Sequence, residues 1–209
     1  MRHTSYELDT SSARQAKVNS RITTKGAYVG KFTLAEAVTA RSGTQGIEFS
    51  FRTDDGQTAD YVTLWTYSQD GTPLYGRKVL DALLTCLKTR KINVTQKTVT
   101  VRAAGGGTET RQADVFAELM DKPIGLFLIV EEYHKNDGSL GSKMVIALPF
   151  EASTKRTASE ILDQQPTAQS FDGILASLRD RPAKKRDRAP AGDRVPAGGF
   201  DDMDDDIPF

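Results

Sequence analysis

The sequence predicts a mainly β fold: a five-stranded barrel with one helix between its third and fourth strands, an insertion after the helix, and a disordered C-terminal tail. Three observations favour this fold. Up to Phe150, short runs of Val, Ile, Phe and Tyr alternate with polar residues, as in half-buried strands. One stretch instead repeats leucine at helical spacing. After Pro166 the 209-residue chain is dominated by Ala, Pro, Asp, Arg and Lys, which bury too little apolar surface to form a core.

Three strands are expected in the first part of the fold. Residues 27–40 alternate well enough for a long strand, in which Gly30 marks a bulge or a close approach of another segment. Apolar residues occupy every second position from Ile47 to Phe51, which indicates the second strand. Residues 59–67, with the sequence ADYVTLWTY, are expected to form the third.

An amphipathic helix is expected after the third strand. The apolar positions that recur at three- and four-residue spacing are Leu74, Val79, Leu80, Leu83, Leu84 and Leu87. The insertion, residues 91–122, is longer than the rest of the fold requires. Within it we expect a short β segment at 94–101 and a helical turn at 116–120.

Two strands are expected to close the fold, at residues 124–133 and 142–150. The sequence KNDG between them, at residues 135–138, is a hairpin signal. The full order is therefore three strands, a helix, an inserted segment and a two-stranded hairpin. This is the connectivity of the OB-fold, a small Greek-key barrel that often binds oligonucleotides.

Composition and charge divide the chain into four segments. These are a flexible N-terminal arm (1–24), the OB-fold domain (25–152), a flexible tail or linker (153–200) and an acidic tip (201–209). Two short helices are expected in the tail, at 159–165 and 171–179. The net charge of the whole chain is zero, but residues 1–150 carry +3 and the last nine residues carry −5. The neutral total therefore hides a mildly basic body and a strongly acidic tip.

Several classes of site are disfavoured by the sequence. Cys86 is the only cysteine, and His3 and His134 are the only histidines, so we expect no disulfide within the chain, no metal and no cofactor. Glu131 and Glu132 are adjacent in a strand and point to opposite faces, so they cannot act as a catalytic carboxylate pair. We expect no enzymatic activity. The polar N-terminus and the lack of a long apolar run favour a cytoplasmic protein without a membrane partner.

The C-terminal sequence DDMDDDIPF is the most specific signal in the chain. Carboxylates attract a basic surface over a Debye length, and an apolar ending can enter a pocket of a partner. Most acidic tails serve solubility alone, but such a tail has no need of exposed apolar residues at its end. The tip resembles that of bacterial and phage single-stranded DNA-binding proteins, which end in several Asp followed by Ile-Pro-Phe. The matching residues are Asp204, Asp205, Asp206, Ile207, Pro208 and Phe209.

This resemblance implies a protein that binds single-stranded DNA without marked sequence specificity during replication, recombination or repair. It also implies that replication or repair proteins dock on the tip. The body looks like a divergent phage OB-fold protein of this class, which would act in the cytoplasm of a bacterial host. A protein-binding adaptor of the replication machinery and a strand-annealing recombination protein are the alternatives, while the lack of a metal cluster disfavours a nuclease. The sequence leaves the oligomeric state open.

The DNA site is expected on the third strand of the body. Alternation places Val62 and Leu64 on one face and Tyr61, Trp65 and Tyr67 on the other. Aromatic rings on the solvent side of a barrel strand are suited to stacking on bases. In the alternative arrangement the aromatic rings fill the core and the aliphatic residues face solvent. With basic residues for the phosphates, the candidate DNA contacts are Tyr28, Lys31, Arg52, Tyr61, Trp65, Tyr67, Arg77, Lys78 and Lys143, and Arg90 and Lys91 are further candidates for phosphate contact.

Overall fold

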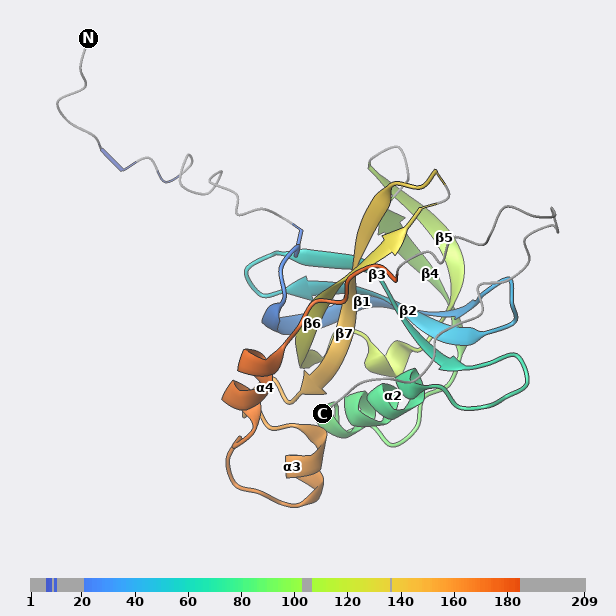
Figure 1. Cartoon of the computed structure of the whole chain (residues 1–209). Helices are drawn as coiled ribbons and strands as arrows, with labels where there is room; N and C mark the ends of the chain where they lie inside the picture. The colour runs from blue at the N-terminus through green and yellow to red at the C-terminus, as the bar shows by residue number, and fades with distance from the viewer. Residues whose placement is uncertain (1–6, 9, 11–20, 103–106, 136, 185–209) are drawn as a thin grey trace, which may run out of the picture.

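Seven strands form one antiparallel sheet (Figure 1). The computed structural model describes residues 7, 8, 10, 21–102, 107–135 and 137–184. The strands are β1 (Gly26–Thr39), β2 (Gln45–Thr53), β3 (Thr58–Tyr67), β4 (Thr95–Arg102), β5 (Thr108–Val115), β6 (Pro123–His134) and β7 (Leu140–Phe150). The helices are α2 (Tyr75–Cys86), the 3-10 turn η1 (Ala117–Leu119), α3 (Ala158–Leu162) and α4 (Phe171–Ser177). The predicted mainly β fold is confirmed.

Strand β1 organises the sheet, because three other strands pair with it. Along one edge it pairs with β2 from Gly30 to Thr39. Along the other edge it pairs first with β6 and then, at Glu36, with β5. Strand β3 extends the sheet beyond β2, and β7 extends it beyond β6. A β carbon at Gly30 would lie 2.1 Å from the carbonyl oxygen of Arg52, so the close approach predicted at this glycine is confirmed.

Helix α2 covers one face of the sheet, which we call the inner face. Its Leu83 is fully buried and belongs to the same core cluster as Phe32, Phe49 and Phe51. The ring centroid of Phe32 lies 4.3 Å from that of Phe49 and 5.9 Å from that of Phe51. Helix α2 also contacts both β3 and β7, the strands at the two ends of the path through β1. The predicted helix thus closes the core on this side.

The sequence predicts a closed barrel, whereas the sheet of the structure is open. Strands β3 and β7 are in contact, but no ladder joins them within the described residues. The chain order β1, β2, β3, α2, β6, β7 follows the predicted order of three strands, a helix and a hairpin. The sheet has seven strands rather than five because the insertion contributes a hairpin of its own.

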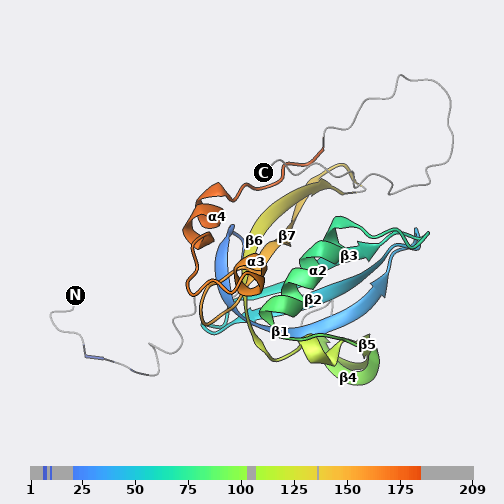
Figure 2. The ribbon, with the colours of Figure 1, turned by 90° about the horizontal axis from the view of Figure 1, so that it is seen from below.

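Hairpin β4–β5 accounts for most of the insertion. The β segment predicted at 94–101 corresponds to β4, and η1 lies inside the helical turn predicted at 116–120. Strand β5 is not predicted, because its sequence TETRQADV has apolar residues only at Ala113 and Val115. These two pack against Leu34 on the face of the sheet turned away from α2, which we call the outer face. Figure 2 shows α2 and the hairpin on opposite sides of β1 and β2.

The segment from residue 153 to residue 184 packs on the body, which corrects the flexible tail expected from residue 153. Helices α3 and α4 overlap the two short helices predicted in this segment. The ring centroid of Phe171 in α4 lies 5.1 Å from that of Phe127 and 5.1 Å from that of Phe150. Leu178 is also buried there. The rest of the expected tail, 185–200, and the acidic tip, 201–209, lie outside the described residues.

The chain after α4 continues along β6 (Figure 1). The backbone N–H of Arg181 donates to the carbonyl oxygen of Val130 at 2.8 Å, and the N–H of Glu132 donates to the carbonyl of Arg181 at 2.9 Å. Arg181 thereby pairs with β6 beyond the part of β6 that β1 covers. Because α4 and this segment cover the outer face over β6 and β7, the part of the outer face that the described residues leave open lies over β2 and β3.

Two further contacts lie near the ends of the described part of the chain. Ile22 is fully buried and donates its backbone N–H to the carbonyl of Thr58 at 2.8 Å. The described end of the expected N-terminal arm therefore belongs to the core. The carboxylate of Glu160, which is 2% exposed, accepts hydrogen bonds from the backbone N–H groups of Thr157, Gln169 and Ser170. These hydrogen bonds tie the residues just before α4 to Glu160 in α3.

Candidate functional site

Strand β3 separates aliphatic from aromatic side chains as the alternation predicts. Val62 is 1% exposed and Leu64 is 6% exposed, so both face the core. Trp65 is half-buried and lies on the outer face, opposite Gly46 of β2. A β carbon at Gly46 would come within 2.8 Å of the Trp65 ring, so the ring lies over this glycine. The alternative arrangement, with Trp65 in the core, is wrong.

Tyr61 is the most exposed aromatic residue of the predicted site. Its side chain is 57% exposed, and its backbone has a φ of 60°, in the left-handed region. The residue lies where the register between β2 and β3 shifts, between the pairs Phe49↔Val62 and Phe51↔Ala59. A tyrosine rarely adopts this conformation, and strained residues of this kind concentrate at functional sites.

Two of the predicted cations lie side by side on the outer face. Lys31 of β1 is directly opposite Arg52 of β2, and both are exposed. Lys31 forms an ion pair with Asp121 at 3.0 Å. Arg52 has no ion pair among the described residues, so its guanidinium is free to meet an anion.

Carboxylates also lie on this face, and the predicted site does not include them. Glu36 of β1 is opposite Glu48 of β2. Arg111 of β5 donates to both carboxylate oxygens of Glu36, at 2.7 and 2.6 Å. Burial raises the pKa of the Glu48 carboxyl; a hydrogen bond from Thr63, at 3.4 Å, opposes this rise and the charge of Glu36 adds to it. The outer face is therefore mixed in charge.

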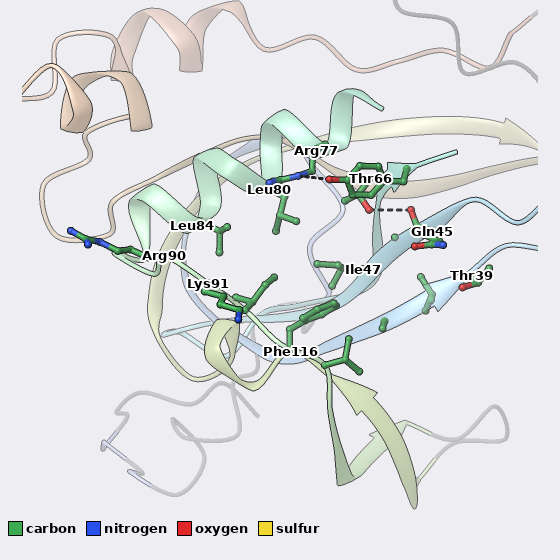
Figure 3. A pocket seen from close by; sticks show the side chains of 16 residues that line it. Thr39, Gln45, Ile47, Thr66, Arg77, Leu80, Leu84, Arg90, Lys91 and Phe116 are labelled. Atoms are coloured by element: carbon green, nitrogen blue, oxygen red, sulfur yellow. Dashed lines mark hydrogen bonds between the residues drawn. The ribbon is translucent and has the colours of Figure 1, made fainter. Parts of the chain in front are cut away.

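A pocket of about 440 Å³ opens on the other side of the sheet, between α2 and the ends of β1 and β2 (Figure 3). Its apolar lining includes Leu80 and Leu84 of α2 and Phe116. Two basic side chains, Arg90 and Lys91, lie on the connection from α2 to β4 and also line it. The lining therefore combines an apolar wall with basic side chains at its edge.

The predicted residues Tyr67 and Arg77 belong to this pocket and not to the Trp65 face. The Nε of Arg77 donates to the Tyr67 hydroxyl at 3.0 Å, and Arg77 also pairs with Asp81. The cause is a register shift at the end of β3: Trp65 pairs with Gly46, whereas Tyr67 pairs with the adjacent Gln45. The strict alternation expected along β3 is therefore wrong beyond Trp65.

The three other predicted contacts lie apart from both groups. Tyr28 packs against the main core, and its hydroxyl donates to the carbonyl of Thr24 at 2.8 Å. Lys78 is on α2 but does not line the pocket; its Nζ lies 6.0 Å from the centroid of the Tyr75 ring. Lys143 is on β7 and pairs with Glu131 at 2.9 Å. The structure thus divides the predicted set instead of gathering it into one site.

The apolar part of the pocket is the feature that sequence reasoning missed. Ile92, Val94 and Phe116 come from segments assigned to the insertion, where no periodic pattern marks them. Val94 is 52% exposed, which is unusual for a residue beside other apolar side chains. The available signal was the sequence RKINV, in which two cations directly precede apolar residues.

Comparison with known proteins assigns the chain to no family. No protein-family model matches the chain, and no curated protein matches it either. Among the described residues, no helix combines the length and the apolar character needed to span a membrane.

Proposed function

We propose that this protein binds single-stranded DNA without marked sequence specificity, as part of DNA replication, recombination or repair. The observation that carries the proposal is the Trp65 ring, which lies on the open outer face over Gly46 while the aliphatic residues of β3 fill the core. The proposed activity is binding alone. It involves no catalytic step and requires no cofactor or metal.

In this proposal the fold is a divergent OB-fold. Strands β1, β2, β3, β6 and β7 take the places of the five barrel strands, and α2 takes the place of the helix between the third and fourth. Hairpin β4–β5 is then an insertion before the fourth strand. The support for this assignment is the chain order together with the contacts of α2 with both β3 and β7.

Bases would stack on the outer face of β3. Trp65 and the exposed Tyr61 present rings there, and stacking on an aromatic side chain contributes about 1–3 kcal/mol per base. Arg52 is unpaired within the described part of the chain and is available for a phosphate. Every base has a π face, and phosphate contacts carry no sequence information, so this arrangement favours binding with little sequence preference.

The acidic tip is proposed to recruit replication or repair proteins. This part of the proposal rests on the sequence DDMDDDIPF and its resemblance to the tips of bacterial and phage single-stranded DNA-binding proteins. Carboxylates of 204–206 would meet basic residues of the partner, and Ile207, Pro208 and Phe209 would fill an apolar pocket.

The binding proposal is tested by titrating labelled oligo(dT), oligo(dA) and duplex DNA with the full chain. We expect tight binding of both single strands, weak binding of the duplex, and affinity that falls steeply with salt. Trp65→Ala should weaken single-strand binding by about 1–3 kcal/mol, because one stacking platform is lost. The lack of any single-strand complex at low salt would refute the proposal.

The recruitment proposal is tested separately, by a pull-down from bacterial extract. The full chain should capture replication or repair proteins, whereas the chain without 201–209 should not. A variant with Phe209→Ala keeps all five Asp and serves as the control for charge. Equal capture by the full chain, the chain without 201–209 and Phe209→Ala would contradict recruitment and would indicate that the tip serves solubility alone.

A protein-binding adaptor remains the second candidate, and one observation favours it. Glu48 lies on the open outer face, opposite the Glu36 that pairs with Arg111, and its carboxylate repels a phosphate. An adaptor would bind no DNA in the titration above and would still capture partners through its tip.

A further inference from the structure

The pocket between α2 and the ends of β1 and β2 combines two kinds of lining. Its walls are apolar and include Leu84, Ile92 and Val94. Two rings also lie there, those of Tyr67 and Phe116. Figure 3 shows Leu84 and Phe116 facing the space between the helix and the strands. Aromatic and aliphatic side chains of this kind are the contacts that a flat heterocycle makes in binding sites.

Three cationic side chains, those of Arg77, Arg90 and Lys91, lie at the edge of the pocket. Arg90 and Lys91 are exposed and form no ion pair with any described residue; the Arg90 side chain points outward from the pocket in Figure 3 and would turn inward to meet a phosphate there. Arg77 is half-buried, and its position is set by the Tyr67 hydroxyl and by Asp81. Three positive side chains against one carboxylate leave the rim of the pocket with a positive excess, which is complementary to phosphates.

We propose that this pocket binds one nucleotide of the DNA strand that passes over Trp65, with its base against Phe116 and Tyr67 and its phosphates against Arg90 and Lys91. The inference rests on the proposed function and adds a second site to it. The pocket volume of about 440 Å³ lies within the range of roughly 300–1,000 Å³ typical of sites for small organic ligands.

The position of Gly46 explains why the nucleotide would belong to the same strand. Gly46 lines the pocket, and the Trp65 ring lies over this same residue on the outer face. The two sites are therefore separated by little more than the thickness of the sheet. The turn at residues 40–44 ends the sheet there, and it carries the exposed Arg41. A DNA strand that crosses this turn would pass from the Trp65 ring on the outer face to the pocket on the inner face.

Photo-crosslinking tests the position of the base. Oligo(dT) with a single 5-iododeoxyuridine, placed at each position in turn, is irradiated with the full chain, and the adducts are mapped by mass spectrometry. We expect adducts on the outer face, at Trp65 or Tyr61, and a second set at Phe116 or Tyr67 from a different position of the oligonucleotide. Adducts confined to the outer face would overturn the inference.

The contribution of the cations is measured in the double variant Arg90→Ala/Lys91→Ala. Loss of two phosphate contacts should reduce the slope of log affinity against log salt by about 1.4, at about 0.7 per phosphate for a single strand. The matched control is Arg21→Ala/Lys97→Ala, which removes one Arg and one Lys that are exposed and outside the pocket. The control should leave the slope unchanged, and equal slopes for the two double variants would overturn the inference.

The remaining outcomes separate this inference from the proposed function. If the unaltered chain forms no complex with single strands, both fail together. If it binds DNA but the pocket gives no adducts, only the inference fails. A peptide with the sequence of 201–209 serves as a competing ligand. If its binding requires Arg90 and Lys91 while the DNA salt slope does not, the pocket belongs to an acidic peptide and the inference is overturned.

Discussion

The Trp65 ring and Gly46 occupy one site on the outer face, where glycine is the residue that leaves room for the ring. The two residues are paired across β2 and β3. A β carbon at position 46 would lie 2.8 Å from the Trp65 ring and 2.7 Å from the carbonyl oxygen of Leu64. The ring is therefore supported from below by backbone, and its exposed side is available to a ligand.

Gly46→Ala is expected to destabilise the fold and to displace Trp65. The added methyl group meets backbone as well as the ring, and overpacking of this kind costs about 1–3 kcal/mol. The measurement is chemical denaturation together with the emission spectrum of Trp65. Gly173→Ala in α4 is the control, because no atom from outside its own helical turn lies within 4 Å of the added carbon and alanine favours a helix. Equal stability of the two variants would contradict the packing described for Gly46.

Glu48→Gln is expected to strengthen both folding and DNA binding at neutral pH. Burial raises the pKa of Glu48 above its usual value of 4.5, so the folded protein holds this proton more tightly than the unfolded chain. Ionisation therefore destabilises the folded state as the pH rises through the raised pKa, and the penalty is absent below about 4.5. Denaturation and oligo(dT) titrations at pH 7 and pH 4 measure the effect. A gain of the same size at both pH values would show that charge is not its cause.

The sequence predicts those parts of the fold that follow one simple period, and the candidate site shows where that period fails. Alternation along β3 correctly assigns Val62 and Leu64 to the core and Trp65 to the outer face. It fails at Tyr67, because the register shift after Trp65 depends on pairing with β2. Strand β5 is polar on most positions and is held by Arg111 and by pairing with β4, neither of which a local pattern reveals.

The segment after Phe150 illustrates a second limit of the sequence. Only a few large apolar residues, such as Phe171, Ile174 and Leu178, occur in a stretch of polar composition. Composition therefore predicts a flexible tail. The residues nevertheless pack because Phe127 and Phe150 leave an apolar surface on the outer face for them, and that surface exists only in the folded sheet.

Phe171→Ala is expected to loosen α4 and the segment that pairs with β6. The ring contacts both Phe127 and Phe150 but is only half-buried, so we expect a loss of about 2–3 kcal/mol, below the range of about 3–5 kcal/mol for a fully buried Phe. Thermal melting and amide exchange of Arg181 measure the loss. Leu162→Ala, at a side chain that is 70% exposed, is the control and should change stability by less than about 0.5 kcal/mol. If Phe171→Ala behaves like this control, the segment does not stabilise the body.

Glu160→Gln is expected to destabilise the segment between α3 and α4. Burial opposes ionisation, but hydrogen bonds from the backbone N–H groups of Thr157, Ser170 and Gln169 outweigh it and lower the pKa of Glu160 to about 2. The carboxylate therefore stabilises the fold above about pH 4.5, and this contribution is lost as the pH falls towards about 2. An amide cannot accept all of these bonds, so we expect a loss of about 1–3 kcal/mol at pH 7.

The control for this prediction is Glu132→Gln, at an exposed carboxylate that accepts no hydrogen bond within the described part of the chain. Denaturation of the three proteins between pH 2 and pH 7 gives the comparison. Parallel pH profiles for the unaltered chain and Glu160→Gln would contradict the role of this carboxylate.

Stacking of single-stranded DNA on Trp65 would change the fluorescence of this residue directly, because Trp65 is the only tryptophan in the chain. The decisive measurement is Trp65 fluorescence during titration with oligo(dT) at low and at high salt, with the anisotropy of a labelled oligonucleotide recorded in parallel. The account predicts saturable quenching that follows the anisotropy and shifts to weaker affinity as salt rises. Binding by anisotropy without any change in Trp65 emission would place the DNA elsewhere, and a flat response in both signals would contradict the proposed function.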